Sequence, residues 1–194
     1  MEIKQKYKFD CGCEVDLIDE KVKSEDGLPS LFIDYYNLNK NCPLAWTIFH
    51  EGKTQGVWQL EKNLGQNWSK QIKPSNIEEI AALGALLRPG CLRGILDGKS
   101  MTQHYADRKN GIENNTPLHP QLSGLLDDTY NVLTYQEQSM AIAKELAKFN
   151  LQQADTLRKA IGKKKPEIMA KAKKEFIEGC KTAGIVNEED AAMI

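Results

Sequence analysis

The sequence predicts a mainly α protein in which a helical domain follows a small irregular or β N-terminal segment. Three observations support this fold class. Apolar residues recur at helical spacing through the last third of the chain, helix-capping residues recur from residue 43 onward, and alternating strand-like patterns are confined to the first 40 residues. We therefore expect an N-terminal accessory segment over 1–43 and a helical region over 44–194.

The charges are distributed unevenly along the chain. The formal net charge is -1, but residues 1–41 hold nine Asp or Glu against six Lys, whereas residues 140–181 hold eleven Lys or Arg against five acids. A basic segment attracts polyanions, so we expect a phosphate-bearing partner at the C-terminal third.

Cysteine usage and hydropathy favour a soluble cytoplasmic protein. The five cysteines are an odd number and are scattered, which argues against the disulfide framework of a secreted domain. No apolar run approaches the roughly 18 residues of a membrane span, and the start MEIKQKYKFD lacks the apolar core of a signal peptide. We expect no membrane partner.

The N-terminal segment contains two strand-like stretches. Residues 8–17 and 31–36 alternate and are rich in β-branched or aromatic residues, with turn residues Asp26, Gly27, Pro29 and Ser30 between them. Cys11 and Cys13 offer a zinc alternative, but a zinc site needs a second ligand pair that this spacing does not supply. Ordinary strand cysteines are the favoured interpretation.

Helix signals begin at residue 43. Pro43 suits the first turn of a helix over 43–49, and Ser75 with Glu78 has the spacing of a capping box. That second helix is expected to end at Arg88, before Pro89. Residues 90–124 are expected to be rich in loops.

Residues 94–100 contain the letters GKS of a phosphate-binding loop, but their glycine spacing excludes that motif. The letters GILDGKS have three residues between the glycines where the P-loop has four, and Arg93 stands where its first glycine belongs. We interpret the stretch as a polar loop.

Three helices joined by short turns follow. The first, over 135–149, should bury one apolar side; Asn150 should cap the second, which Gly162 ends, and Pro166 should start the third, reaching about Cys180. The expected inward residues are Met140, Ile142, Ala143, Leu146, Ala147, Phe149, Ala154, Leu157, Ile161, Met169, Ala172 and Phe176.

A block of five cations accompanies the second helix and the turn after it. Its members are Arg158, Lys159, Lys163, Lys164 and Lys165. A helix N-terminus next to this turn already favours anions, so the five groups could meet one phosphate-bearing ligand. The alternative is a solvated charged face.

Several longer stretches resemble one family. GVWQLE (56–61), IKPSNIEEIAALGALLRPG (72–90), HP (119–120), TYNVLTYQEQSMAIA (129–143) and ADTLRKAIGKKKPEIMAKAKKEFIEG (154–179) are similar, in this order, to the bacterial C-family replicative polymerases, the DNA polymerase III alpha subunits. The resemblance spans about 44–192. Residues 90–105 and 64–70 look most like phage-encoded members.

This resemblance implies a fingers-type helical domain that closes over the incoming deoxynucleoside triphosphate and the DNA primer-template. The implied nucleotide or DNA phosphate contacts are Arg88, Arg158, Lys159, Lys163, Lys164 and Lys165. Tyr135, Gln136 and Gln138 would position that surface or contact the nucleotide. Cationic groups suit phosphoryl transfer, because they neutralise charge on the phosphate oxygens.

The carboxylates that such a polymerase uses to bind metal ions are missing from the sequence. Polymerases hold two Mg²⁺ ions with carboxylates, and in this family a closely spaced aspartate pair does so, but the chain contains no D-x-D. Asp10 only faintly resembles a further family aspartate, so we assign no catalytic or metal-binding residue. A palm-bearing polymerase polypeptide would supply the Mg²⁺ ligands.

Two hypotheses follow. The chain is either part of a DNA-directed DNA polymerase whose catalytic aspartates lie elsewhere, or a non-catalytic nucleic-acid-binding helical module derived from one. A helical domain with a merely solvated basic face is a third possibility. The family's glycine-aromatic-Asn-Lys-Ser-His segment is absent, so we expect a C-terminal truncation; a split gene, an interrupted gene and a truncated record remain open.

Overall fold

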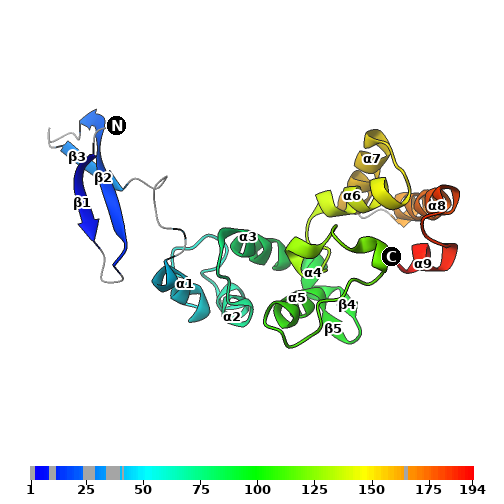
Figure 1. The fold of residues 1–194 in the computed structure, drawn as a ribbon, viewed down its shortest axis with the longest axis horizontal. Helices are drawn as coiled ribbons and strands as arrows, with labels where there is room; N and C mark the ends of the chain where they lie inside the picture. The colour runs from blue at the N-terminus through cyan, green and yellow to red at the C-terminus, as the bar shows by residue number, and fades with distance from the viewer. Residues whose placement is uncertain (1–2, 9–11, 24–28, 34–39, 41, 164–165) are drawn as a thin grey trace. The chain divides into compact units, whose positions relative to one another are not determined.

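The computed structural model describes residues 3–8, 12–23, 29–33, 40, 42–163 and 166–194 (Figure 1). The chain divides into two compact units, Met1–Ala81 and Ala82–Ile194, and each is described by itself. Most described residues are helical, and strands are confined to two small sheets. The predicted mainly α fold class is confirmed.

A three-stranded antiparallel sheet opens the first unit. Its strands are β1 (Ile3–Lys8), β2 (Glu14–Lys23) and β3 (Pro29–Ile33), in the order β1-β2-β3. Tyr7 pairs with Val15, and Ile18 pairs with Phe32.

The predicted strand over residues 8–17 was wrong. That stretch spans the end of β1, the connection and the start of β2, where Gly12 adopts a positive φ of 84°. Alternation of residue types therefore continued across a hairpin. The predicted turn residues Asp26 and Gly27, with residues 34–36 of the second predicted strand, lie outside the described residues, whereas Pro29 and Ser30 belong to β3.

The helical part of the first unit consists of α1 (Pro43–His50), α2 (Asn63–Ile72) and the start of α3 (Ile77–Leu86). Pro43 begins α1, as predicted. Leu60 and Ile72 are buried, and the side chain of Thr54 donates to the Leu60 carbonyl at 2.5 Å. The sequence analysis did not predict α2.

The cap of α3 lies one residue later than predicted. Asn76 Oδ1 accepts from the Glu79 backbone N–H at 2.8 Å, while Glu79 Oε2 accepts from the Ser75 N–H at 2.7 Å and its hydroxyl at 3.0 Å. The Ser75–Glu78 box was therefore wrong. The carboxylate that closes the cap is Glu79, which is buried, whereas Glu78 is exposed.

The second unit begins with short elements: α4 (Pro89–Arg93), β4 (Ile95–Leu96), β5 (Lys99–Ser100) and α5 (Met101–Lys109). The expectation of a loop-rich region missed α5. This helix is polar, but Thr102, His104 and Tyr105 are buried, so its helical state depends on tertiary contacts rather than on apolar periodicity. Ser100 caps it by accepting from the Gln103 N–H at 3.1 Å.

A helical bundle completes the second unit. After η2 (Pro120–Leu122) and η3 (Asp127–Thr129) come α6 (Gln136–Leu146), α7 (Leu151–Lys163), α8 (Pro166–Ala183) and α9 (Glu188–Met193) (Figure 1). The core residues are Leu122, Leu126, Ile142, Ala143, Leu146, Ala147, Phe149, Ala154, Cys180, Val186 and Ala191.

The three predicted helices correspond to α6, α7 and α8, although some of their bounds and inward residues differ from the prediction. Pro166 begins α8, and Phe176 packs edge-on against Phe149 with ring centroids 6.4 Å apart. Met169 was wrongly placed inward, since it is 38% exposed, and the buried Ala160 was missed. In the described parts of the chain, no helix is long and apolar enough to cross a membrane.

Candidate nucleic-acid interface

Helix α7 carries the first two cations of the predicted block. Its start is fixed by a reciprocal cap in which Asn150 Oδ1 accepts from the Gln153 N–H at 2.9 Å and Gln153 Oε1 accepts from the Asn150 N–H at 3.0 Å. Ala154 and Ala160 are buried against the bundle. The apolar side of the helix therefore leaves Arg158 and Lys159 at the surface.

Arg158 and Lys159 meet at one carboxylate. Asp155 Oδ1 accepts from Arg158 Nε at 2.9 Å and Nη2 at 2.8 Å, and Asp155 Oδ2 lies 2.7 Å from Lys159 Nζ. The hydrogen bond from Lys159, followed by those from Arg158, lowers the pKa of Asp155 against the opposing effect of burial. The two cations are thus drawn together, within reach of a single anion.

The remaining cations of the block are only partly described. Lys163 is the last residue of α7, and Lys164 and Lys165 lie outside the described residues. Helix α7 runs past Gly162, which was predicted to end it, so Lys163 belongs to the helix and not to the turn after it. Pro166 begins α8.

Gln138 holds the start of α6 in place. Its Oε1 accepts from the backbone N–H groups of Thr134 and Tyr135, both at 2.9 Å, and its Nε2 donates to Thr129 Oγ1 at 2.7 Å. Thr129 is buried, and its hydroxyl lies 2.8 Å from the Val132 carbonyl. Every polar atom of the Gln138 amide is therefore engaged within the protein.

Tyr135 and Gln136 flank this contact on the outer side. Tyr135 is the N-cap residue of α6 and is half-buried, which raises the pKa of its phenol. Gln136 is the first helical residue and is exposed. Gln136 differs from Gln138 in being exposed, whereas Tyr135 and Gln138 are both half-buried.

Arg88 lies on a different element from the α7 cations. It is exposed and forms the N-cap position of α4, where its carbonyl accepts from the N–H groups of Cys91 and Leu92, both at 3.1 Å. Burial raises the pKa of the Cys91 thiol, and the positive charge of Arg88 opposes that shift.

A polar network is centred on Glu113, and the sequence pattern did not predict it. Glu113 Oε2 lies 2.8 Å from His104 Nδ1, and Glu113 Oε1 accepts from Arg108 Nε at 2.7 Å. His104 Nε2 lies 2.8 Å from the Leu96 carbonyl. Burial raises the pKa of Glu113, but the hydrogen bonds and charges of Arg108 and His104 outweigh it and lower the pKa to about 2.

The same network accounts for the lysine of the GKS stretch. Lys99 Nζ lies 2.6 Å from Asp107 Oδ2 and 3.5 Å from Glu113 Oε2, and Ser100 caps α5. Lys99 and Ser100 thus serve α5, and the stretch interpreted as a polar loop instead forms the two short antiparallel strands β4 and β5.

Arg108 extends the network toward α6. Its Nη1 donates to the carbonyls of Tyr130 at 3.3 Å and Asn131 at 3.0 Å, two residues with positive φ. The sequence offered no signal for these contacts, because the partners are separated by more than twenty residues and follow no period. Asp155, in contrast, could have been found from its i, i+3 and i+4 spacing to Arg158 and Lys159.

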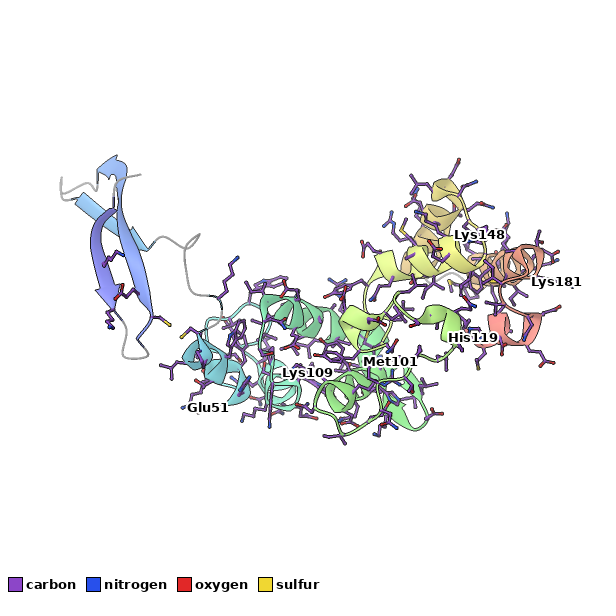
Figure 2. All side chains as sticks on the ribbon, in the orientation of Figure 1. Glu51, Met101, Lys109, His119, Lys148 and Lys181 are labelled. Carbon is purple, nitrogen blue, oxygen red and sulfur yellow. The ribbon has the colours of Figure 1, made fainter. Side chains whose placement is uncertain are left out.

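His119 of the HP motif lies beside α9, and Figure 2 labels its side chain. Its Nδ1 accepts from the Gln121 N–H at 3.2 Å, and its Nε2 lies 3.5 Å from Asp190 Oδ2. This motif residue therefore connects η2 to the end of the bundle.

Metal-binding side chains do not cluster in the described part of the chain. Among these residues, no group of three or more His, Cys, Asp or Glu side chains is placed to hold a metal ion. Asp10 and Cys11 lie outside the described residues, so the structure does not test their interpretation.

Comparison with known proteins identifies the class. Residues 15–184 match the family model described as the bacterial DNA polymerase III alpha subunit finger domain, and the chain belongs to this family. The resemblance seen in the sequence is thereby confirmed. The match begins at residue 15, within β2, and so includes part of the N-terminal segment that had shown no resemblance.

Individual relatives carry the same description. The chain is 38% identical over 177 residues to the DNA polymerase III subunit alpha of Aquifex aeolicus, covering 91% of this chain and 14% of the relative. The Pseudomonas aeruginosa protein is 39% identical over 168 residues (84% and 14%), and the Bacillus subtilis protein 35% identical over 166 residues (86% and 14%). The chain therefore matches about one seventh of the length of each relative.

Proposed function

We propose that this chain contributes the fingers surface of a DNA-directed DNA polymerase. In this proposal, its basic surface binds the triphosphate of the incoming deoxynucleotide and the phosphates of the primer-template. The catalytic aspartates and the Mg²⁺ ions they hold belong to a palm-bearing polymerase polypeptide, and the assembly works in the cytoplasm, in the host cytoplasm if the gene is phage-encoded.

The observation that carries the proposal is the pair Arg158 and Lys159 on α7, inside a chain that belongs to the fingers family. Their side chains are 38% and 59% exposed and both reach the same carboxylate. An arginine fork matches two oxygens of a phosphate, and a neighbouring ammonium adds a point charge. Phosphoryl transfer depends on cationic groups placed in this way.

The other site residues take supporting roles in this proposal. Lys163, Lys164 and Lys165 follow Arg158 and Lys159 in the sequence and are proposed as further phosphate contacts, and Arg88 adds a separate phosphate contact. Gln138 acts by holding residues 129–135 against the start of α6, because its amide is already engaged. Gln136 is the exposed member of that group, and Tyr135 next to it is half-buried; in this proposal the two contact the nucleotide or position the surface that binds it.

Double replacement of Arg158 and Lys159 by alanine tests the proposal. Each phosphate contact releases condensed counterions, so the variant should bind primer-template more weakly, and the slope of log K against log salt should fall by about 1 to 2. Fluorescence anisotropy over a range of salt concentrations measures both quantities.

The matched control replaces Lys173 and Lys174, two exposed lysines of α8, by alanine. This control removes the same number of charges from the same unit. An unchanged slope in the Arg158 and Lys159 variant, or an equal loss in the control, would show that α7 makes no specific phosphate contact.

A further inference from the structure

The Asp155 carboxylate occupies hydrogen-bond donors of Arg158 and Lys159 that a phosphate can use. Its Oδ1 accepts from Nε and Nη2 of Arg158, and its Oδ2 lies against Lys159 Nζ, at 2.7 to 2.9 Å. These are two of the five N–H donors of the guanidinium and one of the three of the ammonium. A phosphate that uses the same three donors must take the place of the carboxylate, because both anions offer oxygens to them.

We infer that Asp155 is a placeholder for phosphate: it holds Arg158 and Lys159 together in the unliganded protein and is displaced when a phosphate group takes the same donors. The inference rests on the proposed function of Arg158 and Lys159 as phosphate contacts. It assigns to Asp155 a positioning role, with no contact to the ligand.

The exposure of the three side chains supports an exchangeable arrangement. Asp155 is 34% exposed, Arg158 38% and Lys159 59%. Ion pairs exposed to this degree are weak, because water competes for both partners. A phosphate carrying two or more charges can therefore replace the carboxylate, whereas a buried pair would resist exchange.

The negative charge of Asp155 determines whether its replacement strengthens or weakens phosphate binding. After displacement, the Asp155 carboxylate remains one helical turn from the bound phosphate and repels it. At about 5 to 8 Å in screened water, that repulsion and the lost ion pairs together amount to roughly a three- to tenfold loss of affinity. Removing the charge of Asp155 should therefore strengthen binding, although the cations lose their partner.

The test measures binding of inorganic triphosphate to the full chain by isothermal titration calorimetry. Four proteins are compared: wild type, Asp155→Asn, Arg158→Ala/Lys159→Ala, and the triple variant. Asp155→Asn should bind roughly three- to tenfold more tightly than wild type, and the triple variant should lose that gain. Asp155→Ser provides a second replacement, and circular dichroism verifies that each variant remains helical.

Glu145→Gln is the charge-matched control, because Glu145 is an exposed carboxylate of α6 whose oxygen lies 4.0 Å from Lys148 Nζ. Equal tightening in this control would overturn the inference, since the gain would then be a general charge effect. Binding by Asp155→Asn that is equal to or weaker than wild type also overturns it. The proposed function survives that outcome if wild type binds triphosphate and Arg158→Ala/Lys159→Ala does not.

A third outcome would overturn both proposals. If wild type and Asp155→Asn bind triphosphate no more tightly than Arg158→Ala/Lys159→Ala, then these cations are not a phosphate site. Both the proposed function of α7 and the placeholder role of Asp155 are then wrong.

Discussion

At the scale of single residues, the two glutamines of the YQEQ stretch have different surroundings. Gln138 joins two backbone N–H groups and the hydroxyl of Thr129, whereas Gln136 is exposed at the first helical position. A pattern of letters treats the two as equivalent. The structure separates a residue that organises the start of α6 from one that faces outward.

Replacing Gln138 by alanine should therefore lower the free energy of unfolding by about 1 to 3 kcal/mol, because two backbone N–H groups lose their acceptor and the Thr129 hydroxyl loses one of its partners. The Gln136→Ala change should stay within about 0.5 kcal/mol of wild type. Urea denaturation followed by circular dichroism compares the two variants. Equal stabilities would contradict the role given to the Gln138 amide.

At the scale of elements, the network of His104, Arg108 and Glu113 connects α5 to its surroundings. Glu113 receives hydrogen bonds from α5, and Arg108 continues to the carbonyls of Tyr130 and Asn131, ahead of α6. Helix α5 is polar and short, so these contacts, with the packing of Tyr105 against Tyr130, stabilise it. The region expected to be loop-rich is ordered by its charged residues.

The pKa of Glu113 gives this network a defined pH dependence. Its folded-state pKa is lowered from 4.5 to about 2. The stabilisation is therefore complete above about pH 4.5 and is lost as the pH falls toward 2. Since the side chain is 22% exposed, we expect about 1 to 2 kcal/mol rather than the larger value that the full shift would give.

Glu113→Gln tests this dependence. The difference in free energy of unfolding between wild type and the variant should be largest above about pH 4.5 and should shrink as the pH falls toward 2, because the unfolded state is protonated first and the folded carboxylate keeps its charge until about pH 2. Chemical denaturation at several pH values measures it. Glu145→Gln, at an exposed position, should differ little from wild type throughout; a constant difference for Glu113→Gln would exclude the ionic explanation.

At the scale of the whole molecule, the chain is a family member that matches about one seventh of the length of its relatives. In the proposed function its cations bind phosphate, and its described residues show no cluster of metal-binding side chains. Two-metal catalysis needs carboxylates that hold both ions. The proposed activity is thus a property of an assembly.

Primer extension should consequently appear only when this chain is mixed with a polypeptide that carries the family's palm aspartates, together with Mg²⁺ and deoxynucleotides. A gel assay of primer length measures it, with Arg158→Ala/Lys159→Ala as the variant expected to lose activity. Extension by the purified chain alone would contradict the assignment of catalysis to a partner. DNA binding without extension in every mixture would favour the non-catalytic module.

The amino-acid pattern alone specifies the features that depend on near neighbours in the chain. Pro43 and Pro166 begin helices, Asn150 caps α7, and the apolar residues of α6 enter the core as their spacing predicts. Capping and helical periodicity act over three or four residues, so they can be read from the sequence. The family resemblance follows from the same local stretches.

Only the tertiary structure shows how the polar side chains are paired. Gln138 with Thr129, His104 with Glu113, and Arg108 with Asn131 join residues nine to twenty-three positions apart, and no repeat in the sequence marks them. Buried polar groups take whichever partner the packed elements bring close, because leaving them unpaired is costly. The tertiary contacts therefore determine that Gln138 organises the start of α6 and that Lys99 pairs with α5. They also stabilise α5 as a helix.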